Sequence, residues 1–364
     1  MFIDSIKLDQ FRNYESLELS FSPGTNILYG DNAQGKTNIL EAVYLCGTTR
    51  SHRTSKDKEM IRFGQDQAHL RMILSRDDFS DQIDVHLRAS KAKGIAINSV
   101  PIRKARDLMG KVYLVFFSPE DLQMIKNGPS ERRKFLDVEI SQMDPVYISD
   151  LSSYVRVINH RNRLLKDISF HPSLLPTLDA WDEQLVSYGK KIIEKRDLFI
   201  KDISDEVKDI HGNLTGNKEK IELVYEPNVS VEDMEEQLKK SRGKDLQTGT
   251  SVVGPHRDDV AVMVNGIDLR KYGSQGQQRT AALSLKLSEI FLIQKLKKEK
   301  PILLLDDVLS ELDEKRQTYL LNSIHDIQAL ITCTGLDDFI QRRFSMDRIF
   351  TVHQGTVKES KFFN

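Results

Sequence analysis

The sequence GDNAQGKT at residues 30–37 determines how the rest of the chain is interpreted. It matches the pattern GxxxxGK[ST] and lies between an apolar strand-like run at 26–29 and a helix-like run at 38–46. In such a loop the glycines let backbone N–H groups turn toward phosphates, Lys36 reaches the β- and γ-phosphates, and the Thr37 hydroxyl binds Mg²⁺. The alternative is a turn in which the glycines only allow the backbone to bend. The strand before and the helix after favour a nucleotide site.

This loop supplies the first candidate site residues. Lys36 is both a phosphate ligand and a candidate catalytic residue, and Thr37 is a candidate metal ligand. The full set of nucleotide contacts predicted from the loop is Gly30, Asp31, Asn32, Ala33, Gln34, Gly35, Lys36, Thr37 and Asn38.

Composition limits the class of protein. The chain of 364 residues is long enough for one large or two ordinary domains. Its hydrophobic content of 39% is enough to form a hydrophobic core. The formal net charge is -1, so binding to nucleic acid would depend on local basic patches. The two cysteines, Cys46 and Cys333, lie in apolar runs without metal-ligand spacing. No apolar run approaches the roughly 18 residues of a membrane span, so we expect a cytoplasmic protein with no membrane anchor.

The hydrophobic pattern predicts an α/β protein with a large insertion. Short alternating and continuous apolar runs at 1–117 and 246–364 predict a discontinuous head built on a mixed sheet. Residues 118–245 have mainly helical periodicity, and they predict an inserted lobe. Because no long heptad array appears, we expect this lobe to be compact.

Two adjacent acids, Asp306 and Asp307, follow the apolar run 302–305. Asp306 is suited to hold Mg²⁺ opposite the Thr37 hydroxyl, and Asp307 to orient or deprotonate an attacking water. The alternative is that paired acids simply end a buried strand in solvent. With the phosphate loop upstream, the sequence favours a hydrolase site formed by two segments far apart in the chain.

Further motifs carry a family resemblance. They are SQGQ at 274–277, LLDDVLSELD at 304–313, and, in the same order as in known members, LDQFRNY at 8–14, FSPEDL at 117–122, GPSERR at 128–133 and GPHRDD at 254–259. Together with GDNAQGKTN at 30–38, they resemble the ABC/SMC-like ATPases of DNA maintenance over essentially the whole chain. The combination is far more specific than any single motif.

The resemblance implies an ABC-type ATPase head that binds ATP and Mg²⁺ and forms a homodimer around ATP on DNA. In that family the signature serine of one subunit faces the γ-phosphate held by the other. It also implies work with RecO and RecR in loading RecA at single-stranded gaps, in recombination, repair and the SOS response. The residues placed at the dimer seam are Ser274, Gly276, Gln277 and Asp313.

Four features leave alternatives open. Asp307 replaces the glutamate of many ABC ATPases, so we expect slow, DNA-stimulated hydrolysis. Arg12 is a candidate nucleotide contact or an ordinary surface arginine. Thr332 and Thr334 stand where related ATPases often have a γ-phosphate sensor. His256 and Arg257 belong either to the dimer seam or to a structural turn.

Basic residues concentrate in the first third of the chain and suggest contacts to the DNA backbone, without sequence specificity. No basic aromatic ribbon or zinc finger is present in the sequence, so duplex or junction DNA is favoured. The candidates are Arg50, Arg53, Lys56, Lys91, Lys93, Arg103, Lys104, Arg132 and Arg133.

Two other functions remain possible. A chromosome-architecture ATPase of the SMC kind would share the same motifs, although the lack of a long heptad arm counts against it. A small-molecule kinase would also use the phosphate loop, but it would leave the SQGQ element at 274–277 without a role.

Overall fold

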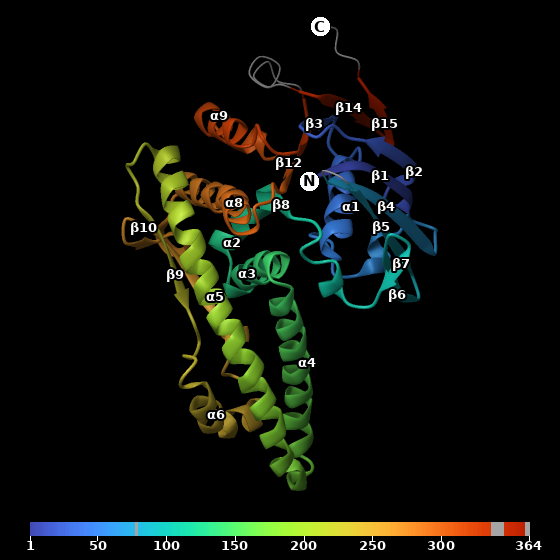
Figure 1. Cartoon of the computed structure of the whole chain (residues 1–364). Coiled ribbons are helices and arrows are strands. Elements are labelled where there is room, and N and C mark those ends of the chain that lie inside the picture. Colours follow the sequence, from blue (N-terminus) through green and yellow to red (C-terminus); the bar gives the residue numbers. More distant parts are fainter. Residues whose placement is uncertain (77–78, 336–345, 361–364) are drawn as a thin grey trace. The chain divides into compact units, whose positions relative to one another are not determined.

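The computed structural model describes residues 1–76, 79–335 and 346–360 (Figure 1). The chain divides into two compact units, which we call the first unit (Met1–Asp121 and Glu289–Asn364) and the second unit (Leu122–Ser288). Among the described residues, no helix combines the length and apolar composition that a membrane crossing requires.

The centre of the first unit is a sheet in the order β15-β14-β3-β13-β12-β8. All neighbouring pairs are parallel except β14 and β15, which form a terminal hairpin. The strands at 114–117, 302–306 and 329–333 are nearly continuous apolar runs, as is typical of parallel strands covered on both faces. Their bounds are β3 (Thr25–Tyr29), β8 (Leu114–Phe117), β12 (Ile302–Asp306), β13 (Ala329–Cys333), β14 (Arg348–His353) and β15 (Thr356–Glu359).

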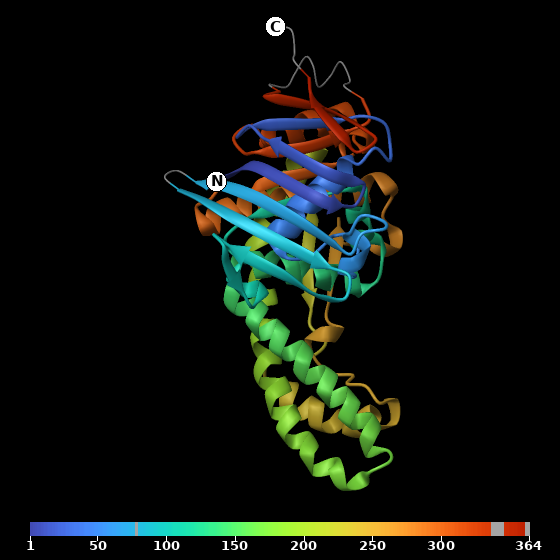
Figure 2. The same cartoon turned by 90° about the vertical axis from the view of Figure 1, so that its right-hand side faces the viewer.

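A second, antiparallel sheet has the order β2-β1-β4-β5-β6-β7, and its strands are the blue and cyan arrows of Figure 2. Helix α1 (Lys36–Thr48) is buried almost all round, since its side chains share one core with strands of both sheets. The bounds are β1 (Phe2–Phe11), β2 (Tyr14–Ser20), β4 (Gln67–Arg76), β5 (Phe79–Arg88), β6 (Lys91–Ile97) and β7 (Val100–Ile102).

Short elements complete the first unit. The first segment of this unit ends at Asp121, close to the boundary at residue 118 that the sequence predicts between head and lobe. At this boundary the Ser118 N–H donates to Asp121 Oδ2 at 2.6 Å. The remaining elements are η1 (Asp57–Met60), η2 (Ala105–Asp107), η3 (Pro119–Asp121), η6 (Leu309–Glu311) and α9 (Glu314–Ser323).

The second unit is mostly helical, as the periodicity predicts. Helices α4 (Pro145–Ile168) and α5 (Leu178–Thr215) run antiparallel (Figure 1). At 38 residues, α5 is about 57 Å long, which is longer than a compact lobe suggests. The other elements are α2 (Leu122–Lys126), α3 (Pro129–Met143), η4 (Pro172–Thr177), α6 (Met234–Thr248), η5 (Pro255–Arg257), α7 (Leu269–Tyr272), the sheet β11 (Ile267–Asp268), β10 (Asp259–Val264) and β9 (Ile221–Glu226), and α8 (Gln275–Lys297), which continues into the first unit.

The contacts divide the chain differently from the predicted boundaries. Residues 246–288, assigned from the sequence to the head, lie in the second unit, because β10 pairs with β9 along its whole length. Two glycines that would favour a loop or turn lie inside regular elements: helix α6 continues through Gly243 to Thr248, and Gly94 is part of strand β6.

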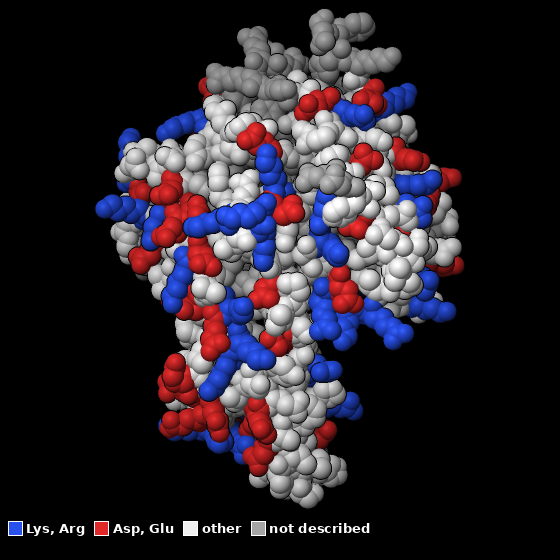
Figure 3. Space-filling model, viewed as in Figure 1, with Lys and Arg blue, Asp and Glu red and all other residues white. Residues whose placement is uncertain are grey.

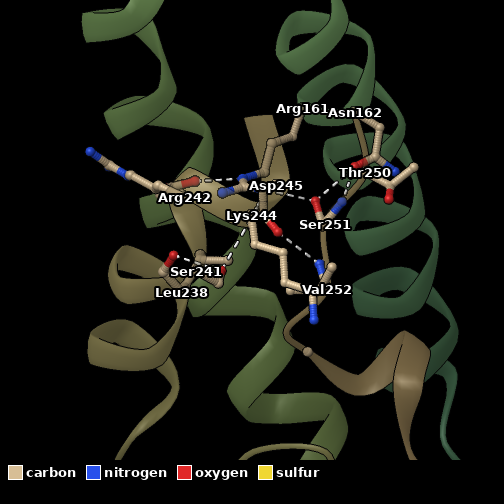
Figure 4. Close-up of polar contacts among 12 residues, drawn as sticks. Arg161, Asn162, Leu238, Ser241, Arg242, Lys244, Asp245, Thr250, Ser251 and Val252 are labelled. Atoms are coloured by element: carbon tan, nitrogen blue, oxygen red, sulfur yellow. Dashed lines mark hydrogen bonds and ion pairs between the residues drawn. The ribbon is translucent and has the colours of Figure 1, made fainter. Parts of the chain in front are cut away.

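A buried ionic network joins the helices of the second unit (Figure 4). Arg161 of α4 is fully buried, and its guanidinium donates to Asp182 Oδ1 of α5 at 2.6 Å and to Asp245 Oδ2 of α6 at 2.7 Å. The same Nη1 donates to Ser251 Oγ at 2.8 Å. A buried guanidinium is stable only when paired, so this arginine fixes three segments that are distant in sequence.

His256, a candidate for the dimer seam, has a structural environment. Its Nε2 donates to the Ser251 carbonyl at 2.9 Å, and its Nδ1 accepts from the Tyr154 hydroxyl at 2.7 Å. Burial lowers the pKa of His256 to about 4, so the ring is neutral near pH 7.

Replacing Arg161 with Leu should strongly destabilise the second unit. The substitution removes the arginine that pairs with the buried Asp245 and one of the arginines that pair with Asp182, and breaking a buried ion pair typically costs about 3–5 kcal/mol. The measurement is urea unfolding followed by circular dichroism. As a control, Glu235→Gln in the exposed Lys239–Glu235 pair should leave the midpoint unchanged. A wild-type midpoint for Arg161→Leu would contradict this assignment.

The buried His256 should also make stability depend on pH. Its pKa in the folded protein lies below the unfolded value of 6.5, so its contribution is complete above pH ~6.5 and is lost as the pH falls toward ~4. The loss amounts to about 3 kcal/mol over that window. Unfolding measured between pH 7 and 4.5 should show a shallower loss for His256→Gln than for the wild type. His171→Gln, at an exposed position, should retain the wild-type slope.

Candidate nucleotide-binding site

The phosphate loop connects β3 to α1 as the sequence predicts. Gly30 and Gly35 have φ angles of +153° and +115°, a region that favours glycine. Space also requires them, since a Cβ on Gly30 would lie 2.3 Å from the Val352 carbonyl oxygen, and one on Gly35 would lie 2.5 Å from Asn13 Nδ2. The loop ends at the N-terminus of α1, where unsatisfied N–H groups favour an anion.

Lys36 lies under the loop and is almost fully buried. Its ammonium donates to the carbonyls of Gly30 at 2.6 Å and Asp31 at 3.0 Å. An ammonium has three N–H donors, so one remains for a phosphate oxygen. The geometry fits the predicted role of Lys36.

Two hairpin turns hold the loop in place, a role that the sequence alone did not indicate. Asn13, between β1 and β2, donates to the Gln34 carbonyl at 3.0 Å and accepts from Asn38 Nδ2 at 2.8 Å. Between β14 and β15, the N–H of Gln354 donates to Gln34 Oε1 at 2.7 Å, and that of Gly355 to the Gln34 carbonyl at 3.3 Å. The only sequence signal was the turn composition of each segment.

The second half of the site lies at the carboxyl ends of β12 and β13. Thr37 Oγ1 donates to Asp306 Oδ1 at 2.9 Å, although the two residues are 269 positions apart. Thr332 of β13 donates to the same carboxylate oxygen at 2.8 Å and accepts from the Asp307 N–H at 2.9 Å. One hydroxyl therefore positions both acids. Thr334 follows the strand and is exposed.

The two acids differ in their surroundings. Burial raises the pKa of Asp306, and the hydrogen bonds from Thr332 and Thr37 only partly offset this. Asp307 has a φ of +52°, an uncommon conformation for a residue with a side chain and one that occurs at functional sites. A hydroxyl beside a carboxylate suits Mg²⁺, which binds one or two carboxylates together with phosphate oxygens. Thr37 and Asp306 therefore fit a Mg²⁺ ion.

A polar cavity of about 270 Å³ lies over the phosphate loop. Besides the loop residues, it is lined by Asp307 and by Arg53, whose Nη1 lies 3.0 Å from Asn38 Oδ1. The sequence assigned Arg53 to DNA, but it lines the nucleotide cavity. The loop residues that line it are Asn32, Ala33, Gln34, Gly35, Lys36, Thr37 and Asn38.

Arg12 does not line this cavity. Its guanidinium donates to the buried Glu41 through Nε at 2.7 Å and Nη2 at 2.5 Å, and through Nη1 to the Glu59 carbonyl at 2.6 Å. Because these hydrogen bonds direct the guanidinium to Glu41 and Glu59, they do not support the predicted contact between Arg12 and the nucleotide.

The predicted signature residues form a helix N-terminus in the second unit. Ser274 Oγ accepts from the Gln277 N–H at 3.2 Å, and Gln277 Oε1 accepts from the Ser274 N–H at 3.0 Å, which is a capping box. Ser274 and Gly276 are exposed at the start of α8. In the first unit, Asp313 caps α9 by accepting from the Arg316 N–H at 3.0 Å.

The predicted DNA contacts separate into exposed and engaged residues. Arg132 is buried and paired with both carboxylate oxygens of Asp259, so its assignment to DNA is wrong. Arg133 donates to the Asp258 carbonyl at 2.7 Å, and Lys93 to Asp57 at 2.8 Å. On the face drawn in Figure 3, basic and acidic side chains are interspersed. The exposed candidates are Arg50, Arg53, Lys56, Lys91, Arg103 and Lys104, and among them Arg53 also lines the nucleotide cavity.

Comparison with known proteins places this site in a family. The model of the RecF/RecN/SMC N terminal domain matches residues 2–358. The chain is 57% identical over 358 residues to the DNA replication and repair protein RecF of Agathobacter rectalis, covering 98% of this chain and 99% of the relative. It is 44% identical to RecF of Clostridium acetobutylicum over 365 residues, covering 99% and 100%.

Solved structures agree. The recombination mediator protein RecF with ATP matches at a TM-score of 0.92 and 36% identity, covering 99% of this chain and 98% of that one. The Smc head domain of Pyrococcus furiosus matches at a TM-score of 0.56 and 17% identity over 99% and 96% of the two chains, which shows a shared fold. The chain belongs to the RecF family of DNA replication and repair proteins, within the wider group of RecF, RecN and SMC N-terminal domains.

Proposed function

We propose that this protein is an ATP-dependent DNA-binding protein of recombinational repair and replication-fork maintenance. ATP holds two copies together on gapped or duplex DNA, and slow hydrolysis releases them. The observation that carries the proposal is the hydrogen bond from Thr37 to Asp306, because it joins the phosphate loop, which lines the cavity, to a carboxylate suited to bind Mg²⁺.

The proposed chemistry divides among the residues of the cavity. Lys36 and the loop N–H groups bind the phosphates, and Thr37 with Asp306 holds Mg²⁺, which would neutralise charge on the phosphate oxygens. Asp307 orients the attacking water and accepts its proton. Asp307 is one methylene shorter than glutamate and is held in a constrained backbone conformation, which supports slow hydrolysis.

The proposed dimer uses α8. Its N-terminus carries Ser274 and Gly276 at exposed positions and directs N–H groups outward. A γ-phosphate bound at Lys36 in one copy would be completed by this helix N-terminus from the second copy. Asp313, exposed at the N-terminus of α9, would lie at the same seam. ATP then stabilises the dimer by mass action, and loss of the γ-phosphate weakens it.

The exposed cations would bind DNA through its phosphates, so binding should weaken as salt rises. One matching structure is of a RecF described in the RecFOR pathway, which supports RecO and RecR as partners and an indirect role in RecA loading. We place this activity in the cytoplasm. We also propose that 1–117 with 246–364 functions as the ATPase head and 118–245 as its insertion, with residues 246–288 belonging to the head by function although they pack within the second unit.

The alternatives are weaker. An SMC-like architectural role rests on fold similarity at 17% identity. A small-molecule kinase would need an acceptor pocket and would leave the Ser274–Gln277 cap without a role. Hydrolysis that increases on adding DNA supports the proposal over the kinase.

ATP, but not ADP, should convert the protein to a dimer in sedimentation velocity. Lys36→Met should prevent this by weakening phosphate binding, and Ser274→Arg by placing a bulky side chain at the helix N-terminus. Ser152→Arg, at an exposed position of α4, is the matched control and should dimerise normally. Wild-type dimerisation by Ser274→Arg would refute the shared site.

Thr332→Val should lower the rate of ATP hydrolysis roughly 10- to 100-fold, because it removes the hydrogen bonds that position Asp306 and Asp307. Binding of ATP in the presence of a chelator should change little, since the phosphate loop remains intact. Thr356→Val, an exposed substitution in β15, serves as the control. An unchanged rate would exclude a positioning role for Thr332.

A further inference from the structure

Glu41 is a fully buried acid in α1, one helical turn after Thr37. Neither the phosphate loop nor the paired acids use it. Both of its carboxylate oxygens accept hydrogen bonds from Arg12, and Oε1 also accepts from Ser51 Oγ at 2.5 Å. A buried charge with this many partners has a specific structural or functional task.

The carboxylate is ionised. Burial alone would raise the pKa of Glu41, but the hydrogen bonds from Arg12 and Ser51 and the positive charge of Arg12 outweigh it, and the pKa lies below its usual range. Glu41 therefore presents a fixed negative charge beside the nucleotide cavity.

Ser51 connects Glu41 to the loop that follows α1. While its hydroxyl donates to Glu41, its oxygen accepts from the N–H groups of Arg53 at 3.0 Å and Thr54 at 3.1 Å. The His52 ring packs on Phe116 with centroids 4.1 Å apart. The start of the loop is therefore fixed on both sides of Arg53.

Arg53 is the residue that this arrangement presents to the cavity. Its Nη1 lies 3.0 Å from Asn38 Oδ1 and 3.8 Å from Glu41 Oε2, and its side chain lines the cavity beside Asp307. A guanidinium at this place is suited to bind phosphate oxygens. Without an anchor, an arginine on a surface loop would lose much side-chain entropy on binding.

We propose that Glu41 is a positioning residue for nucleotide binding: through Ser51 and its charge, it holds the Arg53 guanidinium toward the nucleotide phosphates. This inference rests on the proposed function only in that the cavity binds a nucleotide. Glu41 itself does not line the cavity.

The test compares Glu41→Gln, Arg53→Met and the double variant in titrations with MgATP. Each single variant should weaken binding by a similar factor, roughly tenfold, which is the value of one charge-assisted hydrogen bond. The double variant should bind no more weakly than Arg53→Met, because both substitutions remove the same contact. Dependence of the affinity on salt should fall by the same amount in all three, a readout that a general loss of packing would not produce.

Glu59→Gln is the matched control. Glu59 accepts from Thr54 Oγ1 and pairs with Lys56 in the same loop without touching Arg53, so this variant should bind MgATP like the wild type. If Glu41→Gln does not fold, Ser51→Ala replaces it in the cycle, with a smaller loss that is again absent in the Arg53→Met background.

Two results would overturn the inference. The first is wild-type affinity for MgATP in Glu41→Gln, or in Ser51→Ala if that variant replaces it. The second is a double variant whose loss of affinity is the product of the two single losses. Failure of the proposed function is distinguishable, since in that case the wild-type protein itself would not bind MgATP.

Discussion

The hydrogen bond between Thr37 and Asp306 is the contact on which the first unit depends. It exists only because β3, β13 and β12 are parallel neighbours whose carboxyl ends lie at one edge of the sheet. Ligands bind at this edge in open α/β sheets, where loops and helix N-termini converge. The Thr332 hydroxyl, on the strand between the other two, completes the arrangement. Every segment between residues 37 and 306 must therefore be accommodated without disturbing this edge.

The sequence predicted the parts of the site whose signal is local. The phosphate loop and the apolar strand before the paired acids each require only neighbouring residues, and the structure has them where they were expected. The charged residues were less predictable, because a basic residue looks the same whether it is solvated or paired with a distant acid. Arg132 pairs with Asp259, 127 positions away, and Arg53 lies over the phosphate loop.

Arginine has two distinct uses in this protein. Arg161 and Arg196 are buried in the second unit and bind carboxylates from other segments, so they fix tertiary structure and contribute nothing to an external field. Arg50 and Lys56, by contrast, are exposed, which fits the proposed contacts to DNA phosphates. A net charge of -1 is compatible with the proposed DNA binding, because buried arginines and their carboxylate partners neutralise one another inside the protein. Only a few exposed cations are then needed to face the DNA phosphates.

The loop after α1 brings the two proposed ligands together. Arg50, Arg53 and Lys56, spaced three residues apart, are all exposed, and of the three Arg53 lines the nucleotide cavity. Glu41, Ser51 and the His52 ring fix this segment, so the fold sets the positions of Arg50 and Lys56 relative to the nucleotide cavity. Under the proposed function, any effect of one ligand on the other must be reciprocal: if DNA tightens ATP binding, ATP must tighten DNA binding by the same factor.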